Sequence, residues 1–207
     1  EISYEENETG LSPNQFVVMN AMESNTSGLA VFDGDRLKSL RHHPGSAMSN
    51  FQAKNKEQKF AVEALLDKSV ELVTLTGLAG SGKTYVALMA GLDGLQEGRY
   101  SRIVISRSIQ PVGRDIGFLP GDLGEKMAPW MAPIMDNFRA MMGDKDLTYF
   151  QIMMDKGELE VAPLSFIRGR TFNDAYVIVD EAQNATIHEL KTIITRVGKN
   201  SKIVLLG

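Results

Sequence analysis

Residues 77–84 read Gly77-Leu78-Ala79-Gly80-Ser81-Gly82-Lys83-Thr84, a complete G-x-x-x-x-G-K-T pattern. Glycines tolerate backbone angles that turn successive amide N–H groups into one concavity, which suits phosphate oxygens. A helix opening directly after the loop adds its N-terminal dipole to the same anion site. In this pattern the lysine reaches the β- and γ-phosphates and the threonine hydroxyl ligates Mg²⁺. The stretch predicts a phosphate-binding loop, and the alternative is a glycine-rich turn that only packs tightly.

We predict that this loop and the residue after it bind a nucleotide, with Lys83 also acting in catalysis and Thr84 also binding the metal. No guanine-reading N-K-x-D pattern follows the loop in this sequence, which favours ATP over GTP. The nucleotide-binding candidates here are Gly77, Leu78, Ala79, Gly80, Ser81, Gly82, Lys83, Thr84 and Tyr85.

A second candidate half of the site follows the apolar run 177–179, which ends in Asp180 and Glu181. The end of a strand in a parallel sheet faces the ligand crevice, so Asp180 there can hold Mg²⁺. Glu181 can polarise the attacking water as a general base. The alternative is a helix N-terminus that carries acids because of its dipole. Gln183 is a candidate contact to the γ-phosphate, and helix capping near Thr186 is its alternative.

Apolar runs of strand length alternate with helical patterns on both sides of the loop. Such an alternation is typical of an α/β fold with a mostly parallel sheet and helices on both faces. We expect the two acids to lie on a parallel neighbour of the strand before the loop, and the Met-rich helix near Pro129 and Pro133 to be interrupted. The expected strands are 72–75, 102–106, 159–162, 175–179 and 202–206. One helix is expected to begin near residue 55, and two more are expected over 83–96 and 186–196.

The N-terminal part lacks the alternation of strands and helices seen in the rest of the chain. Two short β-favouring runs, 16–19 and 29–32, flank a turn-rich segment and predict a small β-hairpin. A two-stranded hairpin is marginal alone, so it must pack on something else. Residues 36–59 are basic and contain a linker-like segment. We therefore divide the chain into a small β-rich connector, residues 1–48, and a second domain, residues 49–207.

Composition excludes several classes of protein. The net charge is −4, which argues against a polybasic coat on nucleic acid, though not against a local basic groove. The chain has no cysteine, which removes disulfide scaffolds, iron–sulfur clusters and thiol catalysis. No membrane span or secretory start is recognisable, so we expect a cytoplasmic protein without membrane contact. The sequence ends at Gly207 directly after a predicted strand, and we expect the second domain to be truncated at its C-terminus.

Several longer motifs in the second domain agree with one known family. They are Gly77–Thr84, Gly117-Phe118-Leu119-Pro120-Gly121-Asp122, Ala162–Phe172, Asp180–Asn184 and Thr195-Arg196-Val197-Gly198. In this order and spacing they resemble the PhoH family of ATPases, which is related to superfamily 1 helicases. The resemblance covers residues 50–207. Residues 11–50 are similar to the connector of longer PhoH proteins that carry an N-terminal PIN ribonuclease domain.

The resemblance implies a RecA-like P-loop NTPase core, ATP with Mg²⁺, and a role linked to RNA binding or unwinding. It also implies a PIN nuclease domain in the same full-length chain, and a homo-oligomer of the ring type found among PhoH relatives. It assigns Gln58 to adenine, although from the residues alone Gln58 reads as a solvated helix residue.

Arginines near predicted strand ends are the remaining candidates. An arginine can stabilise charge on the γ-phosphate, from its own chain or from a neighbouring subunit. Arg196 is the preferred nucleotide-side candidate, and Arg107, Arg168 and Arg170 are candidates for RNA or phosphate contacts. Structural ion pairing is the alternative for each of them.

Two functions from different classes fit these observations. The first is Mg²⁺-dependent ATP hydrolysis coupled to RNA binding or remodelling. The second is a nucleotide-gated module that controls a partner protein or a fused ribonuclease without translocating. RNA-stimulated ATP turnover with salt-dependent RNA affinity separates the two.

Overall fold

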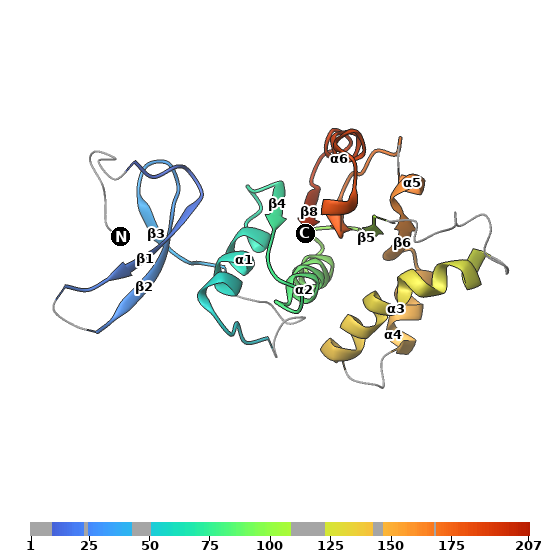
Figure 1. The fold of residues 1–207 in the computed structure, drawn as a ribbon, viewed down its shortest axis with the longest axis horizontal. Coiled ribbons are helices and arrows are strands. Elements are labelled where there is room, and N and C mark those ends of the chain that lie inside the picture. The colour runs from blue at the N-terminus through green and yellow to red at the C-terminus, as the bar shows by residue number, and fades with distance from the viewer. Residues whose placement is uncertain (1–9, 23–24, 43–50, 109–122, 143–146, 168) are drawn as a thin grey trace.

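The computed structural model describes residues 10–22, 25–42, 51–108, 123–142, 147–167 and 169–207. Figure 1 shows a small antiparallel sheet at one end and a parallel sheet with its helices at the other. The boundary predicted between residues 48 and 49 lies outside the described residues.

The N-terminal unit is a three-stranded antiparallel sheet, called the small sheet below. Strands β1 (Gln15–Asn20) and β2 (Ser27–Phe32) pair as the predicted hairpin, which is therefore confirmed. A third strand, β3 (Leu37–Ser39), was missed because it is short and lies in a basic stretch. The turn before β3 is closed by Asp33, whose Oδ1 accepts from the amides of Asp35 and Arg36 and whose carboxylate pairs with Lys38.

The main unit is a five-stranded parallel sheet in the order β4-β8-β7-β5-β6. It confirms the predicted α/β P-loop fold, and the strands match their predicted ranges closely. The elements are α1 (Lys56–Leu66), β4 (Leu72–Leu75), α2 (Lys83–Gln96), β5 (Arg102–Arg107), α3 (Leu123–Met142), α4 (Leu147–Asp155), β6 (Leu159–Pro163), α5 (Leu164–Ile167), β7 (Ala175–Asp180), η4 (Ala182–Asn184), α6 (Ile187–Ile194) and β8 (Lys202–Leu206).

Helices cover both faces of the sheet, as predicted. Successive strand residues point to opposite faces, so Ile103 and Ile105 pack with helices α1–α4, whereas Val104 packs with α5 and α6. Both clusters are buried hydrophobic cores. The sheet is therefore a rigid platform whose strand ends can hold a site in place.

Two expectations about this unit were wrong. Strand β8 lies between β4 and β7, so the acids sit two strands away from the loop strand and not on its neighbour. Helix α3 runs through both Pro129 and Pro133 without interruption. Its residues Ile134 and Phe138 are buried in the core, and this packing outweighs the helix-breaking tendency of proline.

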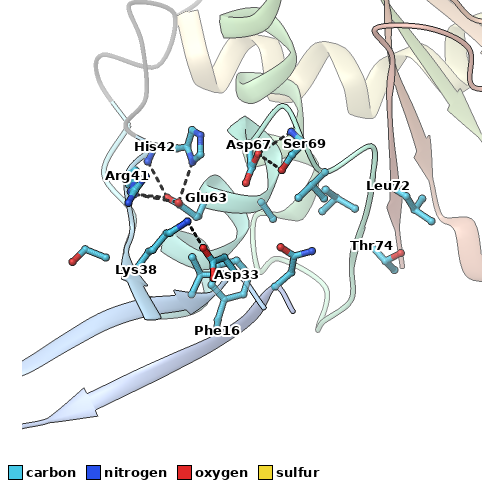
Figure 2. A pocket seen from close by; sticks show the side chains of 16 residues that line it. Phe16, Asp33, Lys38, Arg41, His42, Glu63, Asp67, Ser69, Leu72 and Thr74 are labelled. Carbon is cyan, nitrogen blue, oxygen red and sulfur yellow. Dashed lines mark hydrogen bonds and ion pairs between the residues drawn. The ribbon is translucent and has the colours of Figure 1, made fainter. Parts of the chain in front are cut away.

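The small sheet packs against α1. Phe16 of β1 stacks on Phe60 of α1, with ring centroids 4.7 Å apart. Figure 2 shows the cavity of about 580 Å³ between these elements, where Glu63 of α1 faces the chain that leaves β3. The Glu63 carboxylate accepts from the backbone amides of Arg41 and His42 at 2.9–3.1 Å, and lies 3.0 Å from His42 Nδ1. One buried acid thus anchors the connector to the main unit.

Within the part of the chain that the structure describes, no helix combines the length and the apolar character needed to cross a bilayer.

Candidate active site

The loop after β4 has the geometry that its glycines predict. Gly80 and Gly82 adopt positive φ values of 78° and 86°, a region that residues with a side chain rarely enter. Gly82 is also the N-cap of α2, and no side chain caps this helix start. The first amides of α2 therefore have no intrahelical acceptor and are suited to bind an anion.

Lys83, the first residue of α2, lies back across the loop. Its Nζ donates to the carbonyl oxygens of Gly77 at 2.6 Å and Leu78 at 3.1 Å. The ammonium group is thereby held over the concave side of the loop, which is where phosphate oxygens would bind. The Leu78 side chain is 87% exposed, so among the loop candidates it contributes backbone only.

The structure brings the loop and the acids together although β8 separates their strands. Thr84 Oγ1 lies 3.3 Å from Asp180 Oδ1. Asp180 ends β7 and is only 7% exposed. Burial raises the pKa of its carboxyl group, and the nearby Arg107 guanidinium opposes that rise. A hydroxyl and a carboxylate oxygen side by side fit one coordination edge of Mg²⁺, which takes few protein ligands when substrate phosphates supply the rest.

Glu181 is held from both sides. Its Oε1 lies 3.3 Å from Nη2 of Arg107, and its Oε2 accepts from Nε2 of Gln183 at 2.6 Å. Arg107 Nε also lies 3.9 Å from Asp180 Oδ2. The register of the sheet causes this, because Arg107 at the end of β5 pairs with Asp180 at the end of β7. The sequence made Arg107 a candidate for RNA or phosphate contacts, with structural ion pairing as the alternative, and the structure places it against the two acids.

The loop, the two acids and Gln183 line a cavity of about 360 Å³, called the phosphate cavity below. It brings together the loop residues other than Leu78, both acids and Gln183, whose roles in binding and catalysis stay predictions. The lining residues are Gly77, Ala79, Gly80, Ser81, Gly82, Lys83, Thr84, Tyr85, Asn137, Asp180, Glu181, Gln183, Leu206 and Gly207.

Asn137 of α3 lines the phosphate cavity and was missed by the sequence analysis. Its Nδ2 donates to the carbonyl oxygen of Pro133, four residues earlier. No local pattern marks Asn137, because its place depends on how α3 packs over the sheet.

Gln58 touches the outside of the loop. Its Nε2 donates to the Ser81 carbonyl at 3.2 Å, and its Oε1 accepts from the amide of Lys54 at 2.8 Å. A Cβ added at Gly82 would lie 3.4 Å from Gln58 Nε2, which shows how closely the side chain approaches. Its assignment to adenine stays a prediction, but its position beside the loop agrees with that role.

Two other arginines are not brought to the phosphate cavity. Arg170 forms a bidentate pair with Glu160 of β6 and lies 5.6 Å from the centroid of the Phe172 ring. Hydrogen bonds from Arg170 lower the pKa of Glu160. This is the structural ion pair that was the alternative for Arg170. Arg196 is exposed after α6 and is not among the cavity residues. Arg168 lies outside the described residues.

Within the described ranges, no group of three or more histidine, aspartate or glutamate side chains could hold a metal ion. The fit to Mg²⁺ therefore rests on Thr84 and Asp180 as a pair that needs phosphate oxygens to complete its coordination.

Comparison with known proteins gives one family. The model of the family described as PhoH-like protein matches residues 50–207. The chain is 44% identical to Protein PhoH2 of Bacillus subtilis (strain 168) over 200 residues, which covers 94% of this chain and 45% of the relative. It is 41% identical to a PhoH-like protein of the same organism over 140 residues, which covers 68% of this chain and 43% of the relative. Protein PhoH2 of Mycolicibacterium smegmatis is 41% identical over 156 residues, which covers 74% of this chain and 35% of the relative. The chain thus spans less than half the length of these curated relatives.

Proposed function

This chain belongs to the PhoH family of P-loop NTPases, and on that premise we propose that it binds ATP with Mg²⁺ in the phosphate cavity and hydrolyses it. The observation that carries the proposal is the approach of Thr84 Oγ1 to Asp180 Oδ1 across β8. Thr84 lies at the start of α2 and Asp180 at the end of β7. The two residues are 96 positions apart in the sequence, and both line the phosphate cavity.

Each residue then has a separate task. The loop amides and the Lys83 ammonium bind the phosphate chain, and Tyr85 in the first turn of α2 lines the same cavity. Thr84 and Asp180 would hold the metal, which would supply positive charge to neutralise the phosphates. Glu181 accepts a proton from the attacking water. Arg107 lies beside both carboxylates and opposes the rise in the pKa of Asp180 that burial and the neighbouring Glu181 charge cause.

Glu181→Gln tests the hydrolysis step. The amide cannot accept the proton, so we expect ATP to bind with nearly unchanged affinity while single-turnover hydrolysis slows about 10²- to 10⁴-fold. Glu71→Gln is the matched control. Glu71 is an exposed acid just before the start of β4, at the end of that strand away from the loop. Wild-type turnover in Glu181→Gln would mean that another group is the base.

Coupling to RNA is the finer part of the proposal and is supported by the family resemblance of residues 50–207. It predicts that RNA raises the ATP turnover of the protein and that its RNA affinity falls with salt. ATP binding without any stimulation by RNA would instead favour a nucleotide-gated module.

A further inference from the structure

A second cavity of about 530 Å³, called the side cavity below, lies beside the phosphate loop. Its volume is typical of a site for a small organic ligand. It shares Gly77, Ser81, Gly82 and Lys83 with the phosphate cavity, so the two adjoin across the loop. A molecule whose phosphates are bound by the loop can therefore extend into the side cavity.

The walls of the side cavity are mostly apolar, and they come from both parts of the chain. Phe60, Ala61 and Ala64 of α1 line one part. Phe16 comes from β1 of the small sheet and stacks on Phe60 with only 18° between the ring planes. The two rings thus form an aromatic wall that neither part makes alone. A planar aromatic heterocycle is the kind of group that packs well against such a wall.

Polar side chains line the side cavity at the start of α1, along β4 and on the loop, and Gln58 is the one that contacts the loop. Gln58 has committed one amide hydrogen to Ser81 and one oxygen lone pair to Lys54. An amide carries two hydrogens and two lone pairs, so one donor and one acceptor remain. A side-chain amide matches the N6 donor and N7 acceptor of adenine. Mostly apolar walls with the Gln58 amide beside the loop fit a purine base better than a further phosphate or a metal ion.

The position of Phe16 is fixed by more than the ring stack. Glu63, one turn after Phe60 on α1, holds the backbone of Arg41 and His42 after β3, and the residue is only 5% exposed. Figure 2 shows Phe16 and this anchor on opposite sides of the cavity between the small sheet and α1. The small sheet is therefore attached at two points, and its aromatic residue stays beside the loop.

We propose that the small sheet completes the nucleotide site, with the Phe16–Phe60 pair as the wall against which the base packs. The inference rests on the proposed binding of ATP in the phosphate cavity. The proposal gives the connector a role in ligand binding. A bound nucleotide would connect the small sheet to α1, in addition to the Phe16–Phe60 stack and the Glu63 hydrogen bonds.

The test compares two ligands that share their phosphates and differ in the base. Calorimetry measures the affinity of the 207-residue chain and of Phe16→Ala for ATP and for inorganic tripolyphosphate, both with Mg²⁺. Loss of a base–aromatic contact predicts at least about five-fold weaker ATP binding, with tripolyphosphate affinity unchanged. Val18→Ala is the matched control, because Val18 lies on the same strand, is 39% exposed and does not line the side cavity.

The results distinguish a failure of this proposal from a failure of the phosphate assignment. Unchanged ATP affinity in Phe16→Ala contradicts the proposal, and so does an equal loss for both ligands, since Phe16 would then act through the fold. Phe60→Leu, which keeps an apolar side chain in α1, should weaken ATP binding in the same selective way. Failure of the wild-type chain to bind either ligand contradicts the phosphate assignment itself.

Discussion

At the scale of single residues, Glu181 has an unfavourable backbone conformation that its neighbours hold in place. Glu181 has φ of 52°, a region that is unfavourable for a residue with a side chain. Such a backbone costs of order 1–3 kcal/mol and persists only when its surroundings determine it. Here Arg107 and Gln183 bind the two carboxylate oxygens, and the Glu181 carbonyl accepts from the amide of Asn184. The strain lies at the residue to which we assign the proton transfer.

Lys83→Ala belongs to this scale. Among the described residues, the lysine bonds to loop carbonyls alone, so we expect the variant to fold normally. A charge-assisted hydrogen bond contributes about 1.5–3 kcal/mol, which predicts ATP binding weaker by about 10- to 100-fold. Titration with ATP measures this, beside Lys156→Ala at an exposed position after α4. Normal ATP affinity in Lys83→Ala would refute the assignment of the loop.

At the scale of elements, α2 matters most because it carries the loop lysine and lies close to the sheet. Two glycines make the close approach possible. A Cβ at Gly91 would lie 2.8 Å from the ring of Tyr176, and one at Gly94 would lie 2.6 Å from the ring of Tyr100. Both tyrosines are buried in the hydrophobic core, so other core side chains would have to shift if either ring moved. The helix gives up intrinsic propensity at these positions in exchange for contact with the sheet.

Gly91→Ala tests this balance. Helix propensity alone predicts a gain of about 1 kcal/mol, whereas overpacking of a rigid core costs about 1–3 kcal/mol. We expect the clash with Tyr176 to prevail and the free energy of unfolding to fall. Urea denaturation measures the change, with Lys59→Ala at an exposed position of α1 expected to stay within about 0.5 kcal/mol of wild type. A stabilised Gly91→Ala would show that the core yields more easily than the structure indicates.

At the scale of the whole molecule, Lys202 connects two elements far apart in the sequence. It is the first residue of β8, it is 1% exposed, and its Nζ donates to the carbonyl oxygens of Ala64 and Asp67 at the end of α1. Burial lowers the pKa of this lysine from 10.5 to about 8. The helix that bears both Phe60 and Glu63 is thus tied to the central sheet through a buried ammonium group.

The lowered pKa of Lys202 predicts a pH dependence of stability. Between pH 8 and 10.5 the unfolded chain binds more protons at this site than the native chain. The free energy of unfolding contributed by Lys202 therefore rises with pH in that window, by at most about 1.4 kcal/mol per pH unit, and is level below it. Denaturation of wild type and Lys202→Met at several pH values isolates this term, because other titrating groups cancel in the difference. A difference that stays flat from pH 8 to pH 10.5 would contradict the buried, charged environment described for Lys202.

Features that depend on neighbours along the chain could be predicted without the structure. The loop 77–84, the strand that ends at Asp180 and the alternation of strands and helices are local patterns of backbone freedom and hydrophobic periodicity. Local patterns carry no information on strand order, so the place of β8 between β4 and β7 was not predictable. The same limit hid the contact of Arg107 with the acids, which depends on the register of β5 against β7.

Which distant segments share a site became clear from the packing of the folded chain. Asn137 reaches the phosphate cavity because buried residues hold α3 against the sheet, and the same burial carries that helix through its prolines. Phe16 reaches the side cavity because the small sheet docks on α1. The physical reason is the same in each case. Burial of apolar surface is non-directional, so the elements that meet are fixed by the packing of the whole chain and not by any one segment.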